Sequence, residues 1–251
     1  MPITNFSEVI GRLEHIIAWA KLNESPSGYF AALYYKMTLA VRDAVLRGEF
    51  ENGSRMEQMD VVFAKRYFEA FDLWQAGGTP TNSWQIAFES VKNDQLAVMQ
   101  HLLLGMNAHI NLDLAIAAAS VRQRDAIFGM RHDFMKINQI IQSLTDQTQA
   151  QLAKIWMPFS WLDQWFRTED EGWVGFSIGV ARGASWKAAQ LLAFASDRAT
   201  EQTIVAELDK NVGLFGQKVQ KPGLWLQFGL RLMRFSEKGT VRAKIEVLEG
   251  I

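Results

Sequence analysis

His109 and Asp113 stand four residues apart in a stretch that is otherwise almost entirely apolar, so one helix would place both side chains on the same side. Imidazole and carboxylate groups bind divalent metal ions and also form general-base pairs. Asp133 is a third candidate, because the spacing 133, 137, 140 and 144 puts its carboxyl in the middle of an apolar face. If two antiparallel helices turn near residue 122, Asp133 lies level with the other two. The three residues then predict a site for one divalent ion.

The metal at such a site could be zinc, iron or manganese, since all three accept mixed imidazole and carboxylate ligands. Two alternatives stay open: a metal-free catalytic or ligand-binding site, and a purely structural hydrogen-bond network. His101 precedes His109 by eight residues, about 12 Å along a helix, so the two cannot bind the same ion. We expect His101 to be catalytic, as a general base or a further ligand, with a hydrogen-bonded core histidine as the alternative.

Several other polar residues lie on or beside inward-facing stripes and are candidates to line a pocket. Tyr34, Tyr67, Arg42 and Arg66 belong to this group, although core packing explains their positions equally well. Asn107 projects from the opposite side of its helix, where it lines the pocket or hydrogen-bonds to a neighbouring helix.

Helical periodicity dominates the elements that must position these residues. The run 96–119 contains no Lys, Arg or Glu and is apolar on every side, which predicts a central helix enclosed by others. A long helix over about 126–156 is expected to pair with it in antiparallel orientation. The fold class is therefore all-α, a multi-helix bundle forming a single domain over 1–251, with a looser C-terminal helical subdomain over 159–251 as the alternative. Further helices are expected around 9–20, 26–47, 54–75, 174–198, 201–214 and 224–235.

Composition narrows the function classes. The 26 basic and 27 acidic residues give a net charge of −1, so we expect no nucleic-acid partner. Cysteine is absent, which leaves any metal to His, carboxylate and amide ligands. The N-terminus lacks the apolar core of a signal peptide, and we find no apolar run that approaches the length of a membrane span, so we expect a cytoplasmic protein.

The apolar pattern of the helix expected near the C-terminus has two interpretations. It combines large apolar residues with two arginines on another side: Trp225, Phe228, Leu232, Phe235, Arg231 and Arg234. Such a stripe is more typical of a helix packed on its domain, so we expect the aromatic side chains to be buried. The alternative is a helix that lies on a membrane surface.

The segment His101-Leu-Leu-Leu-Gly-Met-Asn-Ala-His-Ile-Asn-Leu-Asp-Leu114, with His132-Asp-Phe-Met-Lys-Ile-Asn138 after it, resembles a bacterial family catalogued as domain of unknown function 5995. Phe63-Ala-Lys-Arg-Tyr67 and Trp84 belong to the same resemblance, which covers about Tyr29 to Leu152. A weaker similarity is to the helical zinc-dependent phospholipase C and P1-nuclease group, in which His-x-x-x-Asp pairs bind a metal cluster. That similarity implies a metal at His109 and Asp113, while the other ligands of a three-zinc cluster are missing.

These observations predict a metal-dependent helical enzyme that hydrolyses an ester or phosphoester of a small-molecule substrate. His109, Asp113 and Asp133 would hold the ion, which would activate a water molecule. The alternative is a non-enzymatic protein that binds a ligand or a membrane surface.

Overall fold

The computed structural model describes residues 3–155 and 178–250, and every regular element in these two ranges is a helix. The expectation of an all-α fold is confirmed. The elements are α1 (Phe6–Leu22), α2 (Ser27–Leu46), α3 (Gly53–Gln75), α4 (Asn82–Glu89), η1 (Ser90–Lys92), α5 (Val98–Ala108), η2 (His109–Asp113), α6 (Leu114–Val121), η3 (Arg124–Met130), α7 (Arg131–Ser143), α8 (Thr145–Ile155), α10 (Ile178–Ala193), α11 (Arg198–Gln220), α12 (Leu224–Ser236) and α13 (Val241–Glu249).

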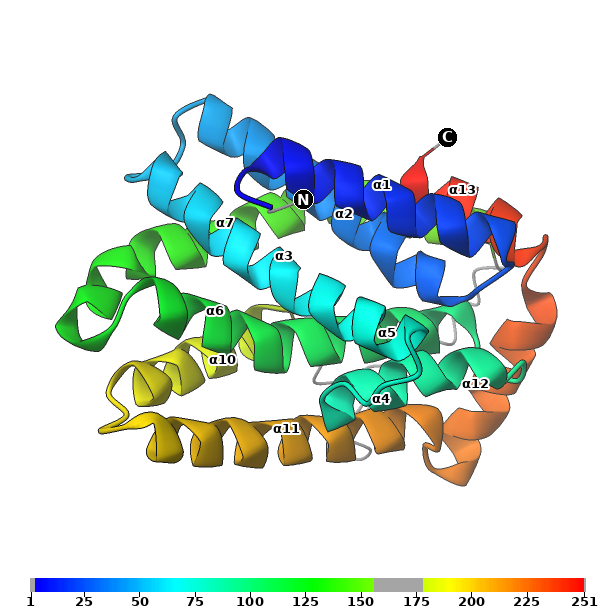
Figure 1. Ribbon diagram of the computed structural model, residues 1–251. Coiled ribbons are helices and arrows are strands. Elements are labelled where there is room, and N and C mark those ends of the chain that lie inside the picture. The colour runs from blue at the N-terminus through cyan, green and yellow to red at the C-terminus, as the bar shows by residue number, and fades with distance from the viewer. Residues whose placement is uncertain (1–2, 156–177, 251) are drawn as a thin grey trace.

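The continuous run α5–η2–α6 forms the centre of the molecule, as the sequence predicted (Figure 1). Helices α2, α4 and α11 pack on α5, whereas α3 and α10 pack on α6. The segment Val98–Val121 is long and apolar enough to span a membrane, with a mean hydropathy of 1.4, so the expectation that no such run exists is wrong. Because 78% of its apolar window is buried inside the molecule, packing among the other helices accounts for its composition.

The prediction that one long helix over about 126–156 pairs with the central helix is wrong. The described part of this region, 126–155, is not one helix but the 3₁₀ turn η3 followed by α7 and α8, with a break at Leu144. Residue Arg124 has a φ of +51°, and the chain passes through an irregular connection rather than a tight hairpin. Helix α7 consequently packs on α2, and the helix that lies along α6 is α10.

Helices from the C-terminal part contribute to the same hydrophobic core as the N-terminal part. Trp186 of α10, Val212 of α11 and Ile245 of α13 are all buried in it. Residues 159–177 of the subdomain considered above lie outside the described residues. In the described remainder, α10, α11 and α13 pack directly on α6, α5 and α2.

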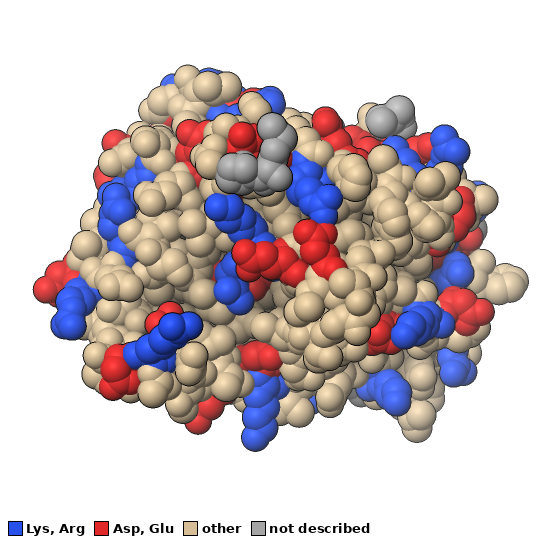
Figure 2. Space-filling model, viewed as in Figure 1, with Lys and Arg blue, Asp and Glu red and all other residues tan. Residues whose placement is uncertain are grey.

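Helix α12 buries the opposite face from the one expected. Leu226, Leu230 and Met233 pack against the start of α5, while Trp225 is 74% and Phe235 92% exposed. The expectation that the aromatic stripe faces the core is therefore wrong. Elsewhere on the surface, basic and acidic side chains are interspersed, as the face in Figure 2 shows.

Candidate functional site

His109 and Asp113 begin and end the π-helical turn η2, which interrupts the central helix. A π turn is rare because its wider hydrogen-bonding pattern packs less well than an α-helix, and such turns occur frequently at functional sites. The Nδ1 atom of His109 lies 3.1 Å from Oδ2 of Asp113. The predicted pairing of these two residues is therefore present.

Asp113 is fully buried and held by three donors. Its Oδ1 accepts from Nε of Arg66 at 2.8 Å, and its Oδ2 accepts from the indole N–H of Trp84 at 2.8 Å as well as from His109. The ion pair with Arg66 compensates the carboxylate charge. Both carboxylate oxygens accept hydrogen bonds from protein donors, and through one of these bonds Asp113 orients His109.

These contacts determine the tautomer of His109. A carboxylate only accepts hydrogen bonds, so Nδ1 of His109 carries the hydrogen and Nε2 carries a lone pair. Burial lowers the pKa of His109, although the hydrogen bond to Asp113 acts in the opposite direction, and the ring is neutral at physiological pH. The ring stacks on Phe63 with centroids 3.5 Å apart and meets Tyr34 edge-on at 4.5 Å. Its buried Nε2 has no hydrogen-bond partner among the described residues.

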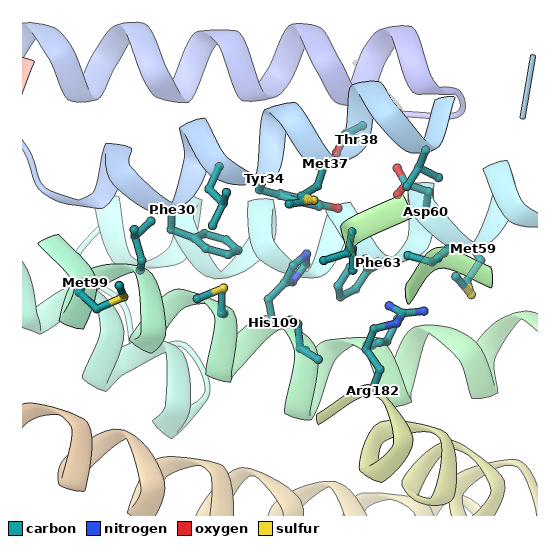
Figure 3. A pocket seen from close by; sticks show the side chains of 18 of the residues that line it. Phe30, Tyr34, Met37, Thr38, Met59, Asp60, Phe63, Met99, His109 and Arg182 are labelled. Atoms are coloured by element: carbon teal, nitrogen blue, oxygen red, sulfur yellow. The ribbon is translucent and has the colours of Figure 1, made fainter. Parts of the chain in front are cut away.

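His109 lines a cavity of about 220 Å³ between α2, α3, the central helix, α7, α8 and α10 (Figure 3). Most of its walls are apolar, and four methionines give them adaptable shape. The lining residues are Phe30, Leu33, Tyr34, Met37, Thr38, Val41, Met59, Asp60, Phe63, Met99, Leu102, Met106, His109, Ile110, Leu114, Ile137, Ile141, Leu152 and Arg182.

Three cavity residues that can form hydrogen bonds were not singled out from the sequence: Thr38, Asp60 and Arg182. Asp60 is buried, and its Oδ2 has no partner among the described residues. A signal was available for Asp60 and Arg182, because each interrupts an apolar helical stripe. Asp60 stands four residues after Met56, and Arg182 stands four residues before Trp186, the same pattern that drew attention to Asp133.

Asp133 does not join His109 and Asp113, so the predicted three-residue metal centre is not assembled. It is fully buried at the start of α7, where it accepts from the backbone N–H groups of Glu51 and Asn52 at 2.8 and 3.0 Å. Arg55 donates to its Oδ2 at 2.7 Å. Asp133 therefore ties α7 to the connection before α3, a consequence of α7 packing on α2 rather than along α6.

A different cluster with metal-ligand side chains surrounds Asp133. Ligand atoms of Glu51, His132 and Asp133 lie within 4.8 Å of one another, with Glu51 and His132 exposed. The carboxylate of Asp133 already accepts three hydrogen bonds, one of them from a guanidinium. These bonds give the carboxylate of Asp133 a structural role, and exposed acidic groups such as Glu51 are common without an ion.

His101 lies apart from His109. Its Nδ1 is 3.0 Å from Oγ of Ser90, whose hydroxyl donates to the carbonyl of Ala87. It lines a separate cavity of about 20 Å³, and burial lowers its pKa to about 3, which keeps the ring neutral. This arrangement fits the alternative of a hydrogen-bonded core histidine.

The five predicted pocket residues have different positions. Tyr34 lines the cavity, with its hydroxyl near Thr38 but without a hydrogen bond of ordinary geometry. Tyr67 is buried in the aromatic core, and Arg66 binds Asp113. Arg42 pairs with its neighbour Asp43 at the surface. Asn107 donates to the carbonyl of Val212 at 2.9 Å and so attaches α11 to α5.

Comparison with known proteins extends the resemblance seen in the sequence. The model of a family of unknown function, DUF5995, matches residues 6–222, a longer range than the motifs suggested. This range includes the His109–Asp113 pair and all residues that line the cavity. Neither the curated proteins nor the solved structures include a chain that matches this one. Because the match covers most of its length, the chain belongs to DUF5995, a family of unknown function.

Proposed function

We propose that the protein binds a small, mainly apolar molecule in the cavity and that Nε2 of His109 accepts a hydrogen bond from it. One observation carries this proposal: a histidine that lines an apolar cavity has a buried Nε2 without a partner among the residues described. A buried acceptor without a partner costs roughly 1–3 kcal/mol, and a ligand that donates a hydrogen bond would recover that cost. The Asp113 carboxylate supports recognition by holding the imidazole in one tautomer.

The cavity volume limits the size of the ligand. At about 220 Å³ it is smaller than the roughly 300–1,000 Å³ of sites that hold drug-sized molecules. Its apolar walls favour an aliphatic or aromatic body, and the methionines can adjust to its shape. A small aliphatic alcohol is therefore a suitable first probe.

The arrangement of the site supports ligand binding better than it supports the metal-dependent hydrolase predicted from the sequence. Of the three expected ligands, only His109 presents a free ligand atom to the cavity. Hydrolysis stays a prediction, for which the oriented imidazole would supply a general base.

Two probes with the same apolar chain test the role of His109. We expect 1-octanol to bind about tenfold more tightly than its methyl ether, because only the alcohol donates a hydrogen bond to Nε2. The difference should disappear in His109→Phe, and isothermal titration calorimetry measures both affinities.

The matched control is His101→Phe, which replaces another buried histidine outside this cavity and should keep the preference for the alcohol. The comparison of the two probes on the unaltered protein needs no variant, so it remains valid even if a variant fails to fold. Equal affinity for the alcohol and the ether would contradict the role assigned to Nε2, and no binding of either probe would contradict the cavity as a ligand site.

A second candidate function, attachment to an anionic lipid surface, is supported by α12. This helix exposes Trp225, Phe228 and Phe235, and Figure 1 places it at one end of the molecule. Arg231 is exposed at the edge of that face, and α12 contains no acidic residue. Exposed aromatic side chains next to basic ones are typical of helices that lie in the membrane interface.

Vesicle co-sedimentation tests the lipid proposal. We expect the protein to bind vesicles containing phosphatidylglycerol, and the double variant Trp225→Ser/Phe228→Ser to lose at least tenfold in affinity while keeping its melting temperature. Arg231→Gln should lose about fivefold on these vesicles and nothing on neutral ones.

The matched control is Leu46→Ser, which removes a side chain that is 77% exposed at the end of α2. It should sediment as the unaltered protein does. Unchanged sedimentation of the double variant would contradict the proposal. If the unaltered protein is a dimer in solution and the double variant is a monomer, a second copy of the chain covers this face instead.

A further inference from the structure

Arg182 brings a buried positive charge to the cavity. The residue is 3% exposed, its Nη2 donates to the carbonyl of Phe134 at 2.6 Å, and its guanidinium lies 4.5 Å from the centroid of the Phe134 ring. Its Nε has no hydrogen-bond partner, and no ion pair involves it among the described residues. Burial lowers its pKa to about 9, which leaves the side chain charged at neutral pH. A buried charge without a counter-ion is costly, and an anionic ligand would reduce that cost.

Asp60 lies toward the same end of the cavity but does not neutralise Arg182. Figure 3 shows the Asp60 side chain reaching in from α3 and the Arg182 guanidinium from α10. The two form no ion pair, and Oδ2 of Asp60 has no hydrogen-bond partner in the part of the chain that the structure describes. Burial raises the pKa of Asp60 to about 7, with a smaller contribution from the negative charge of Glu57. In its protonated form Asp60 can donate a hydrogen bond to an acceptor held by Arg182.

We propose that the cavity ligand carries a carboxylate that binds Arg182, with its apolar body directed along α2 and α5 toward Met99. This inference rests on the proposed function and names the class of ligand. A carboxylate matches the planar guanidinium in two parallel hydrogen bonds, and a single buried arginine balances a single negative charge. The ligand also needs a hydrogen-bond donor for Nε2 of His109, which a hydroxyl group would supply. The proposed ligand is therefore a small hydroxycarboxylic acid with an apolar body.

Three probes of equal chain length test the charge preference: octanoate, 1-octanol and octylammonium. Calorimetry on the unaltered protein should show octanoate binding at least tenfold more tightly than 1-octanol, with octylammonium weakest. This comparison needs no variant. Arg182→Met keeps an unbranched apolar stem and removes the guanidinium with its charge, so it should lower octanoate affinity at least tenfold and change 1-octanol affinity by less than about twofold.

The control variant is Lys187→Met, which removes an exposed positive charge from the same helix and should leave all three affinities unchanged. If 1-octanol binds as tightly as octanoate, the carboxylate is overturned and the apolar cavity remains a ligand site. If octanoate binds but Arg182→Met keeps its full affinity, Arg182 is not the anion site and the inference is overturned. If none of the probes binds, both the inference and the proposed function are overturned.

Discussion

Replacement of Asp113 by alanine is expected to lower the free energy of unfolding by about 3–5 kcal/mol, the range observed when one partner of a buried ion pair is removed. The carboxylate is fully buried and accepts from Arg66, Trp84 and His109. Alanine would leave the indole N–H and the imidazole Nδ1–H without acceptors, in addition to the lost ion pair. Urea denaturation followed by circular dichroism measures the change.

Asp209→Ala is a suitable control, because this half-buried carboxylate also accepts two hydrogen bonds, from the backbone N–H groups of Asn82 and Ser83 at the start of α4. We expect it to cost only about 1 kcal/mol, as is usual for helix N-terminal acceptors. A loss for Asp113→Ala no larger than the loss for the control would show that the His109–Asp113 arrangement does not depend on a buried, charged network.

Asp133→Asn is expected to destabilise the protein by about 2–3 kcal/mol at pH 7, even with all divalent ions chelated. An asparagine amide has one oxygen acceptor, so its NH₂ group would face one of the donors now bound by the carboxylate, which come from Glu51, Asn52 and Arg55. A metal-ligand role predicts the opposite result, in which metal-free protein keeps its stability and only metal affinity falls.

The pH dependence provides an independent measurement for Asp133. Burial raises the pKa of its carboxyl, but the two backbone hydrogen bonds and Arg55 together outweigh this effect, and the pKa lies below its ordinary value. The stabilisation by Asp133 is therefore complete above about pH 4 and is lost as the pH falls through the lower pKa of the folded state. The difference in unfolding free energy between the unaltered protein and Asp133→Asn should shrink from pH 7 to pH 3. A difference that is the same at both values would contradict the assigned role.

The sequence alone was sufficient for the fold class and for much of the helix content. The stripe of α1, the helix α3 and the enclosed run 96–119 follow from apolar periodicity, because each helix must bury one side and the central one must bury all sides. It was also sufficient for the His109–Asp113 pair, since four residues along one helix bring two side chains together whatever surrounds them. The short helix α13, which buries Ile245 and Leu248, was not anticipated.

Tertiary structure decided which helices meet. Periodicity shows which side of a helix is apolar but not which neighbour covers it, so α7 was assigned to the central helix although α10 lies there. The same uncertainty placed Asp133 near His109, whereas its partners are residues about 80 positions earlier in the chain. It also inverted the faces of α12, because apolar residues repeat at helical spacing on two sides of this helix. The cavity, with His109, Asp60 and Arg182 from three separate helical segments, depends on long-range packing that no local pattern encodes.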